Sequence, residues 1–431
     1  MYSKISINHL VLSLNWLFIF FPLSFIAGNL IVNLNCLLFI CLGLIYLAKN
    51  NFKFKYNFID ILLFCFCIVL IISSIINQSN IHKSFFYLRF FVFYYICYYL
   101  FKEKIFDIKK VFYFYAIFVF IISADLIIQY FLGYNIIGLK INELGPTSFF
   151  YQEKIAGSFV QQFGFFLIFV IFSNFTKNTF LHKFLISILI SIISISIYVS
   201  FQRMPMMVWM LFLIIYGLIY YKTKLTTILF SIVLLSIFIV NFSSKEIIVK
   251  YNSFFLNVKI VGIKTLKNYS ILTDEKLFKE MKKDKITIRR FEGGSGHASL
   301  FASALYMWGE SKTFGIGYKN FYNKCAEKKL TRCTTHPHNY YLDVLVTTGL
   351  IGLLILLLFL TIIFLKIINL LISNPKNKEI LSIASINFLM YFFPFKSSGS
   401  FFTTANSTYM VIILVILISQ LQKENMSINK N

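Results

Sequence analysis

Long apolar runs recur along the whole chain, and short polar connections separate most of them. Each run is close to the roughly 20 residues that a helix needs to cross a bilayer. Because lipid cannot satisfy backbone N–H and C=O groups, each run must form a helix rather than a loop. The pattern predicts an all-α polytopic membrane protein with about twelve transmembrane helices, over roughly 8–27, 28–47, 57–76, 84–101, 108–133, 157–174, 180–200, 204–221, 225–243, 340–366, 379–396 and 402–421.

A single long polar connection interrupts this pattern and divides the chain. Spans one to nine occupy 1–243, the connection covers 244–339, spans ten to twelve occupy 340–421, and 422–431 form a tail. Within the connection, "YNSFFLNVKIVGIKTLKNY" is apolar enough to lie in the membrane interface, and "DEKLFKEMKKDK" has the composition of a helix. The stretch "RRFEGGSGHASLFASALYMWGESKTFGIGYKNF" predicts a glycine-rich turn, an apolar helix and a second turn. We find no internal repeat.

Composition agrees with the membrane assignment, and the charges orient it. The 431 residues are 58% hydrophobic and 13% charged, with a mean hydropathy of +0.76, whereas a soluble domain carries about a quarter charged residues. With both termini in the cytoplasm, the inner segments hold seventeen lysines and the short outer connections five Lys or Arg, as the positive-inside rule requires. The connection 244–339 then lies outside. It carries eighteen Lys or Arg against eight Asp or Glu, and long translocated loops do not obey the rule.

Two consequences follow from an outer location of this connection. Nucleic acid is a poor candidate partner, because much of the net charge of +24 sits on a translocated loop. Cys325 and Cys333 flank "AEKKLTR" in the same loop, and a pair in an oxidising compartment suggests a disulfide; two unpaired thiols are the alternative. The other five cysteines lie in apolar runs, where they are typical of small core residues.

Unusual polar residues gather near the predicted outer surface. An ionisable residue within the membrane costs about 2.5–3.5 kcal/mol on insertion scales and indicates function by default. Several at one depth predict a polar cavity, and the candidates are Arg89, Asp125, Gln129, Glu153, Arg203, His338 and Asp343.

Most of these residues have a structural interpretation as well. Arg89 can extend its side chain to the interface or pair with Asp125. Arg203, in "SFQRMPM", can be an ordinary turn residue. Glu153 can be a solvated loop carboxylate, and Asp343 can be a helix-start residue favoured by the helix dipole.

His338 is the strongest catalytic candidate. It stands at the start of the tenth run, where free backbone N–H groups and the helix dipole favour an anion and keep an imidazole neutral. A neutral imidazole can accept a proton at neutral pH, and Asn339 can hydrogen-bond a sugar or phosphate. Gly349 and Gly352 would let a neighbouring helix pack closely. A metal pair of His336 and His338 lacks a third ligand.

Two motifs are missing from the sequence. There is no "DxD" pair and no acidic first outer loop, where many metal-dependent lipid-linked glycosyltransferases hold their cation. There is also no GxxxxGK[ST] phosphate loop, so ATP-driven work is not expected. Positive charge outside, without a metal, suggests that arginines neutralise a phosphate-bearing substrate directly. We therefore expect no cofactor.

Several segments together resemble a known family. "HPHNYYLDVLVTTGLIG" contains His338-Asn339, nine residues, then Gly349-x-x-Gly352, a pattern similar to that of the bacterial O-antigen ligase and polymerase superfamily. "MWGESKTFGIGYKNF" and "YQEKIAGSF" are similar to further family segments. The resemblance is best over about 200–355. It implies a GT-C-like fold with one large periplasmic loop, and an inverting, metal-independent transfer of a glycan from undecaprenyl diphosphate.

The resemblance also assigns roles to residues. Arg203 would bind the diphosphate, and His338 would activate the acceptor hydroxyl. The family places an arginine after the small-residue turn at "GGSG", but this sequence has His297 there, so Arg289, Arg290 or His297 itself would supply that contact. Arg89, Glu153 and Asn339 complete the candidate substrate-binding set.

These observations predict a membrane glycosyltransferase of the ligase type, in the bacterial inner membrane, with its active site facing the periplasm. The acceptor would be lipid A–core; for a polymerase, the runner-up, it would be another lipid-linked glycan. The rival of a different class is a lipid-linked oligosaccharide flippase. A flippase would place its cations down a central cavity and would not need a hundred-residue outer loop.

Overall fold

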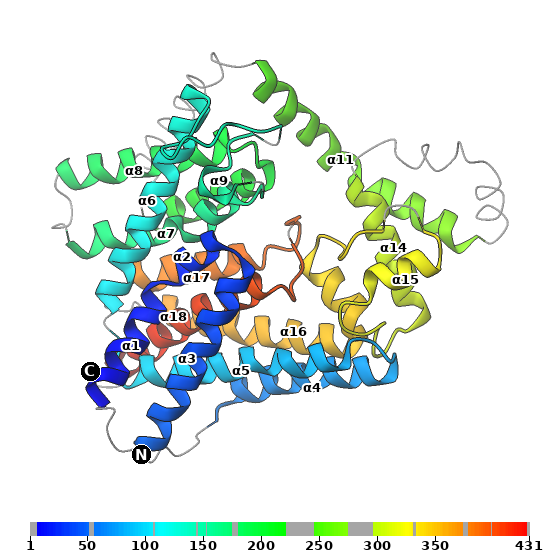
Figure 1. Cartoon of the computed structure of the whole chain (residues 1–431), viewed down its shortest axis with the longest axis horizontal. Coiled ribbons are helices and arrows are strands. Elements are labelled where there is room, and N and C mark those ends of the chain that lie inside the picture. Colours follow the sequence, from blue (N-terminus) through cyan, green and yellow to red (C-terminus); the bar gives the residue numbers. More distant parts are fainter. Residues whose placement is uncertain are drawn as a thin grey trace.

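A computed structural model describes residues 7–50, 56–106, 108–143, 145–151, 153–174, 180–220, 245–274, 296–330, 333–373, 378–397 and 399–428. Fifteen α-helices make up nearly all of the regular structure in these ranges (Figure 1). The chain is an all-α polytopic membrane protein, as its apolar pattern predicts.

The N-terminal half contributes eight helices and one short 3₁₀ turn. Their bounds are α1 Ile7–Ile19, α2 Phe21–Ala27, α3 Asn29–Lys49, α4 Phe58–Ile76, α5 Ile81–Lys102, α6 Ile108–Leu132, η1 Ser148–Phe150, α7 Ala156–Asn174 and α8 Phe180–Val199. The first predicted span is split into α1 and α2, which are bent by 49°. Pro22 lies in the first turn of α2, where its missing N–H costs nothing.

The rest of the chain contributes seven helices. They are α9 Arg203–Tyr220, α11 Lys245–Thr273, α14 Gly296–Glu310, α15 Phe321–Glu327, α16 Tyr340–Ile372, α17 Lys378–Tyr391 and α18 Thr404–Ile428. Three of these helices, α11, α14 and α15, lie in the 244–339 connection. The stretch expected at the interface belongs to α11, while "DEKLFKEMKKDK", at 274–285, lies almost entirely outside the described residues.

Fewer helices meet the length and composition of a membrane span than the twelve that we predict. Six do so among the described residues, or seven if α1 and α2 count as one span. Parts of α7, α8, α9 and α17 form shorter apolar helices. The predicted span over 379–396 is wrong in length, because α17 ends at Tyr391 and an irregular segment follows. The predicted span over 225–243 lies outside the described residues.

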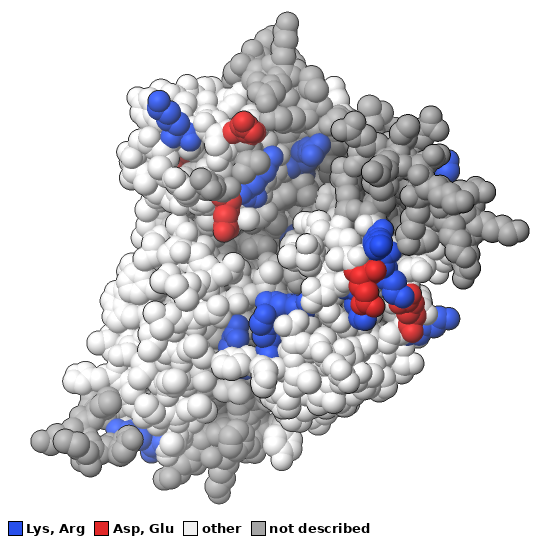
Figure 2. Space-filling view, turned by 45° about the vertical axis from the view of Figure 1, so that its right-hand side comes forward, with Lys and Arg blue, Asp and Glu red and all other residues white. Residues whose placement is uncertain are grey.

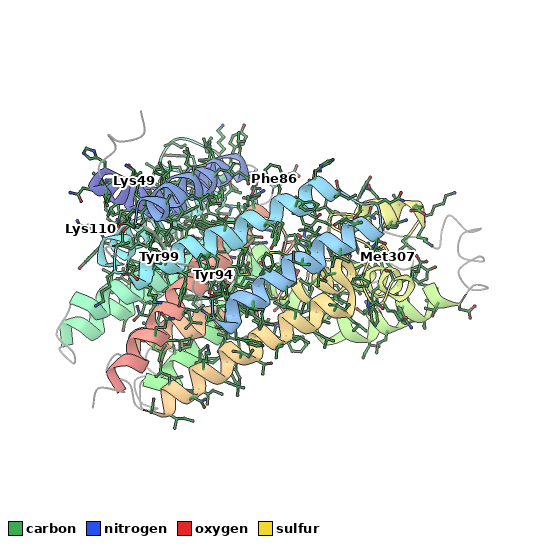
Figure 3. All side chains as sticks on the ribbon, turned by 90° about the horizontal axis from the view of Figure 1, so that it is seen from below. Lys49, Phe86, Tyr94, Tyr99, Lys110 and Met307 are labelled. Atoms are coloured by element: carbon green, nitrogen blue, oxygen red, sulfur yellow. A yellow bond between two sulfur atoms is a disulfide. The ribbon has the colours of Figure 1, made fainter. Side chains whose placement is uncertain are left out.

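The helix ends separate into two groups. Figure 3 shows Lys49, Tyr99 and Lys110 together at one end of the molecule and Met307 at the other. The first three belong to ends that the charge pattern assigns to the cytoplasm, and Met307 belongs to the connection assigned to the outside. The separation agrees with the relative arrangement of these ends in the predicted topology.

The helices of the 244–339 connection have a hydrophobic core of their own, which we call the outer cluster after the predicted side of this connection. Leu272 of α11, Leu300 and Met307 of α14, and Phe321 of α15 are buried in one cluster with Val346 of α16. The main core, rich in phenylalanine and tyrosine, is a separate cluster. Val346 therefore packs the first turns of α16 into the outer cluster, and this contact positions the residues just before α16.

Candidate active site

His338 lies two residues before the start of α16. Its φ is +59°, in the left-handed region that few residues other than glycine adopt. Such a conformation persists only where the surrounding structure enforces it. The backbone around His338 is therefore held in a particular shape by its neighbours.

Three imidazole rings meet at this point. The ring centroid of His338 is 4.2 Å from that of His336 and 5.6 Å from that of His297. His297 is the second residue of α14, and its ring nitrogens lie 3.3 and 3.4 Å from the Ser397 hydroxyl. The structure thus brings together residues from three separate segments of the chain: 333–339, α14 and the segment after α17.

His336 is held in its neutral form. Burial, and then the charge on His338, lower the pKa of His336 to about 4. Its Nδ1 lies 2.9 Å from the Thr335 hydroxyl, and its buried Nε2 has no hydrogen-bond partner among the described residues. At neutral pH this ring adds no positive charge beside His338. No group of three or more His, Cys, Asp or Glu placed to hold a metal occurs in the described ranges.

Asn339 has a structural role that the sequence did not reveal. Its Oδ1 accepts hydrogen bonds from the backbone N–H groups of Tyr341 and Leu342, at 3.0 and 3.1 Å, and so caps α16. Its Nδ2 donates to the Pro394 carbonyl at 2.7 Å. Both ends of the amide are therefore engaged within the protein. We expected free backbone N–H groups at the start of α16 that could bind an anion. This expectation is wrong for Tyr341 and Leu342, because both N–H groups donate to Asn339.

The segment after α17, residues 392–403, is bound to the first turns of α16 at further points. We call it the 392–403 loop. The Tyr341 hydroxyl donates to the Phe392 carbonyl at 2.5 Å, and Asp343 accepts from the Ser400 hydroxyl at 2.6 Å and the Phe401 N–H at 2.9 Å. Asp343 is thus a buried anchor for this loop. These bonds hold the 392–403 loop beside His338.

The glycines of the two motif segments contact each other. Gly349 interrupts α16 with a φ of +68°. Residues 311–317 fill the break: Leu350 N–H donates to the Lys312 carbonyl at 2.8 Å, and Ile316 N–H donates to the Val346 carbonyl at 2.8 Å. A Cβ atom on Gly349 would overlap the Thr313 carbonyl oxygen, and one on Gly315 would overlap the backbone of α16. The neighbour that Gly349 admits is therefore an irregular segment, not the helix that we expected.

Arg203 begins α9, in the turn that follows α8. Its neighbour Gln202 accepts hydrogen bonds from the N–H and hydroxyl of Ser158, at 3.0 and 2.7 Å, in the first turn of α7. Gly157, of the "YQEKIAGSF" segment, lies so close to this turn that a Cβ atom would overlap the Ser200 hydroxyl. Glu153, just before α7, is exposed.

Arg203 and the histidines are related through α11. Burial raises the pKa of Tyr251, near the start of α11, and the charge of Arg203 acts on it in the opposite direction, so Arg203 lies near this end of α11. Asn268, further along α11, donates to the Ser299 hydroxyl of α14 at 3.5 Å, two residues from His297. Tyr251 and Asn268 are 17 residues apart, which corresponds to about 25 Å along a helix. The end of α11 on which the charge of Arg203 acts and the residue of α11 that bonds to Ser299 therefore lie far apart on one helix.

The polar residues of α5 and α6 do not form the expected cavity. Asp125 accepts from the Ile136 N–H at 2.8 Å and the Ser148 hydroxyl at 2.6 Å, and Gln129 accepts from the Thr147 N–H at 2.9 Å. Both hold the outer connection after α6. The pairing of Arg89 with Asp125 is absent from the ion pairs between described residues, since Arg89 Nη2 donates instead to Asn33 Oδ1 at 2.8 Å.

Two further predictions concern the outer connection. Cys325 and Cys333 are joined by a disulfide, which closes the segment between α15 and the histidines. Arg289 and Arg290 lie outside the described residues.

The comparison with known families identifies the central segment of the chain. Residues 186–357 match the family model described as O-antigen ligase. This segment is similar to the O-antigen ligase family. The matched segment runs from within α8 to just beyond the break in α16, so Arg203, His297 and His338 all fall within it, and the resemblance predicted from the motifs is confirmed. The match covers less than half of the chain. No match was found among curated proteins.

Two residues beside the histidines were not predicted from the sequence. Ser397 contacts His297. Lys396 is fully buried over the rings of Tyr340 and Tyr391, at 5.7 and 5.1 Å, and burial lowers its pKa to about 8. Its Nζ has no hydrogen-bond partner in the described part of the chain. The polar stretch "KSSGS", at 396–400 between two apolar runs, is the feature of the sequence that could have indicated these two residues. The predicted span over 379–396 includes Lys396 and leaves Ser397 in the following turn.

Proposed function

We propose that this protein is a membrane glycosyltransferase of the O-antigen ligase type. It moves a glycan from undecaprenyl diphosphate to an acceptor hydroxyl, on lipid A–core, at the periplasmic face of the bacterial inner membrane. The observation that carries the proposal is the position of His338, beside two further imidazoles and at the start of α16, within the segment matched to the O-antigen ligase family.

His338 is the general base in this proposal. Its imidazole accepts the proton of the acceptor hydroxyl while that oxygen attacks the anomeric carbon of the donor sugar. The bond from this carbon to the diphosphate oxygen breaks, the diphosphate leaves with the bonding electrons, and the configuration inverts. The proton then passes from His338 to water. A positioned base of this kind contributes about 10²- to 10⁴-fold to the rate.

The electrostatics of the histidine cluster support this role. When His338 takes up the proton, a charged neighbour would oppose it by Coulomb repulsion. His336, with a pKa of about 4, stays neutral at the pH of the reaction. His297 and Ser397 offer hydrogen-bond donors to the sugar or the phosphate, in place of the family arginine.

Arg203 binds the leaving diphosphate in the proposal, because a guanidinium makes charge-assisted hydrogen bonds to phosphate oxygens. Tyr251, on which the charge of Arg203 acts, lies about 25 Å along α11 from Asn268, which bonds to α14. Binding of the donor therefore has to bring the start of α9 and the histidines to the same substrate. Arg289 and Arg290 are further candidates for the same phosphate.

Deletion of the gene tests the reaction in cells. If the protein is a ligase, its deletion should leave lipid A–core without glycan while long lipid-linked chains accumulate. If it is a polymerase, its deletion should leave single-repeat products on lipid A–core. His338→Ala and Arg203→Ala should each fail to restore transfer while inserting in the membrane at the normal level. The exposed outer residue Lys140 provides a matched control, and Lys140→Ala should restore transfer fully. Near-normal transfer by both His338→Ala and Arg203→Ala would contradict the roles proposed for these two residues.

A further inference from the structure

A second group of positive charges lies at the outer end of α5, apart from Arg203. Arg89 is half-buried on α5. Its guanidinium stacks over the Phe90 ring at 4.5 Å and donates to Asn33 Oδ1 and to the Thr404 hydroxyl, at 2.8 and 3.3 Å. These partners from α3 and α18 are neutral, so they fix the guanidinium in place without neutralising its charge. Its buried Nε has no hydrogen-bond partner among the described residues.

Two lysines belong to the same group, because the charges of Lys83 and Arg89 both act on Lys319. Lys83 is exposed in the first turn of α5, and Lys319 is exposed in the segment that follows Gly317. Asn80, just before α5, donates to the carbonyls of Tyr318 and Lys319 at 3.2 and 3.4 Å, which holds Lys319 against the start of α5. Partial burial of its ammonium group, and then the charges of Lys83 and Arg89, lower the pKa of Lys319. Lys319 is therefore close enough to Lys83 and to Arg89 to be repelled by both.

No carboxylate compensates this group at close range. Among the described residues, none lies within 4.0 Å of Lys83, Arg89 or Lys319. Asp343 is near enough to raise the pKa of Lys319, but its oxygen is engaged by Ser400 and Phe401. By contrast, Lys324 and Lys328, in and just after α15, pair with carboxylates at 2.8 and 2.7 Å. Figure 2 shows, on one face of the molecule, a group of Lys and Arg side chains near the middle, and a group in which basic and acidic side chains mix to one side.

This cationic group is linked to the same framework as His338. Lys319 follows the 311–317 segment, which fills the break of α16 at Gly349. Asp343, whose charge reaches Lys319, is one turn of α16 beyond the cap Asn339. The group is thus tied to the base through α16, whereas Arg203 begins α9. Two separate cationic sites suit a reaction that joins two anionic, lipid-anchored substrates.

We propose that Lys83, Arg89 and Lys319 bind a phosphate group of the lipid-anchored acceptor. This inference rests on the proposed function, in which Arg203 serves the donor diphosphate. A fixed guanidinium beside two exposed lysines, of which Lys319 lies with its Nζ 5.4 Å from the Tyr318 ring centroid, matches a phosphate. Charge-assisted hydrogen bonds to the phosphate oxygens would also relieve the repulsion that acts on Lys319. The location at an outer helix end is the level at which lipid phosphates lie.

Binding of phosphorylated lipids tests the site without any transfer reaction. The purified full-length protein, in nanodiscs of phosphatidylcholine, would be titrated with three probes: bis-phosphorylated lipid A, the same lipid A with its phosphates removed, and undecaprenyl diphosphate. The double variant Arg89→Gln, Lys319→Gln should bind bis-phosphorylated lipid A about tenfold more weakly or worse, from the loss of two charge-assisted bonds. Binding of the dephosphorylated lipid should be unchanged.

The controls separate the site from general effects. Lys140→Gln removes one outer charge elsewhere and should bind like the wild type, and Arg89→Lys should restore part of the lost affinity. In transfer assays the double variant should raise KM for the acceptor, with the donor KM unchanged and kcat at saturating acceptor nearly normal.

Three outcomes would overturn the inference. These are equal binding of bis-phosphorylated lipid A by the double variant and the wild type, weakened binding of undecaprenyl diphosphate alone, and weakened binding of phosphatidylglycerol alone when it is added to the nanodiscs. The last would assign the site to a bilayer headgroup. If the wild type transfers no glycan, the proposed function fails, while the binding result still decides whether this group is an anion site.

Discussion

At the scale of single residues, His336 has a depressed pKa with a consequence for stability. Its imidazole titrates near pH 4 in the folded protein and near 6.5 in an unfolded chain, so the unfolded chain binds the proton more tightly between these values. Stability is unaffected above about pH 6.5 and falls as the pH drops towards 4. At pH 5 the wild type should lose about 1 kcal/mol of its free energy of unfolding through His336, after allowance for partial solvent screening. The His336→Gln variant should not show this loss.

The measurement is thermal unfolding of wild type and His336→Gln, in detergent at pH 7.5 and pH 5. The variant should lose less stability than the wild type between the two values. An equal loss in both proteins would show that His336 is not held neutral by its surroundings.

Gly349 carries a second residue-scale prediction. An L side chain at its φ of +68° costs about 1–2 kcal/mol in the backbone alone, and the added Cβ would also overlap the Thr313 carbonyl. Gly349→Ala should therefore lower the free energy of unfolding by at least about 2 kcal/mol and loosen the 311–317 segment. Gly309→Ala, in α14, is the matched control, because nothing lies within 4 Å of its added Cβ. Similar unfolding temperatures for the two variants would contradict the close packing.

At the scale of elements, Asn339 joins α16 to the 392–403 loop, and two substitutions separate its tasks. Asn339→Ala removes the cap and the donor, and should cost about 1–2 kcal/mol from the cap. Asn339→Asp keeps oxygen acceptors for Tyr341 and Leu342 but cannot donate to the Pro394 carbonyl. It should retain most of the cap and expose the 392–403 loop to limited proteolysis.

Unfolding temperatures and protease digestion of both variants check this prediction. If the Asn339 amide bound substrate instead, both substitutions would raise a KM and leave stability and proteolysis unchanged. The two interpretations therefore give opposite results.

Elements that depend on a local pattern of residues could be predicted from the sequence. Contacts between segments that are distant in the sequence could not. The apolar runs predicted α3 to α6, α16 and α18, because lipid leaves a long apolar segment no other structure. Asp125 and Gln129 were expected in a cavity, but the outer connection folds back onto them, which no local pattern records. Similarly, the spacing of Gly349 and Gly352 predicted close packing, whereas the segment that packs there comes from the distant "SKTFGIG".

The candidate site shows the same division. His338 and His297 could be found from motifs, because both lie within or beside the family segments. Lys396 and Ser397 could not, since their importance arises only when the 392–403 loop is drawn onto α16 by Asn339 and Asp343.

At the scale of the whole molecule, the topology makes a prediction about accessibility. The exposed residues Lys140, after α6, and Lys104, before it, should lie on opposite sides of the membrane. In spheroplasts, a membrane-impermeant maleimide should label Lys140→Cys at once and Lys104→Cys only after permeabilisation, relative to the unsubstituted chain. Labelling of Lys104→Cys in intact spheroplasts would invert the topology and place His338 in the cytosol.

In the proposed reaction His338 is the base for transfer from a lipid-linked donor, and its role can be measured by transfer with the purified protein in proteoliposomes. The donor would be a glycan on undecaprenyl diphosphate, the acceptor lipid A–core, and the proteins wild type, His338→Ala and His336→Ala. The account predicts that His338→Ala lowers kcat by about 10²-fold or more with the donor still bound, while His336→Ala keeps a measurable rate. Transfer by His338→Ala at the rate of the wild type would contradict it.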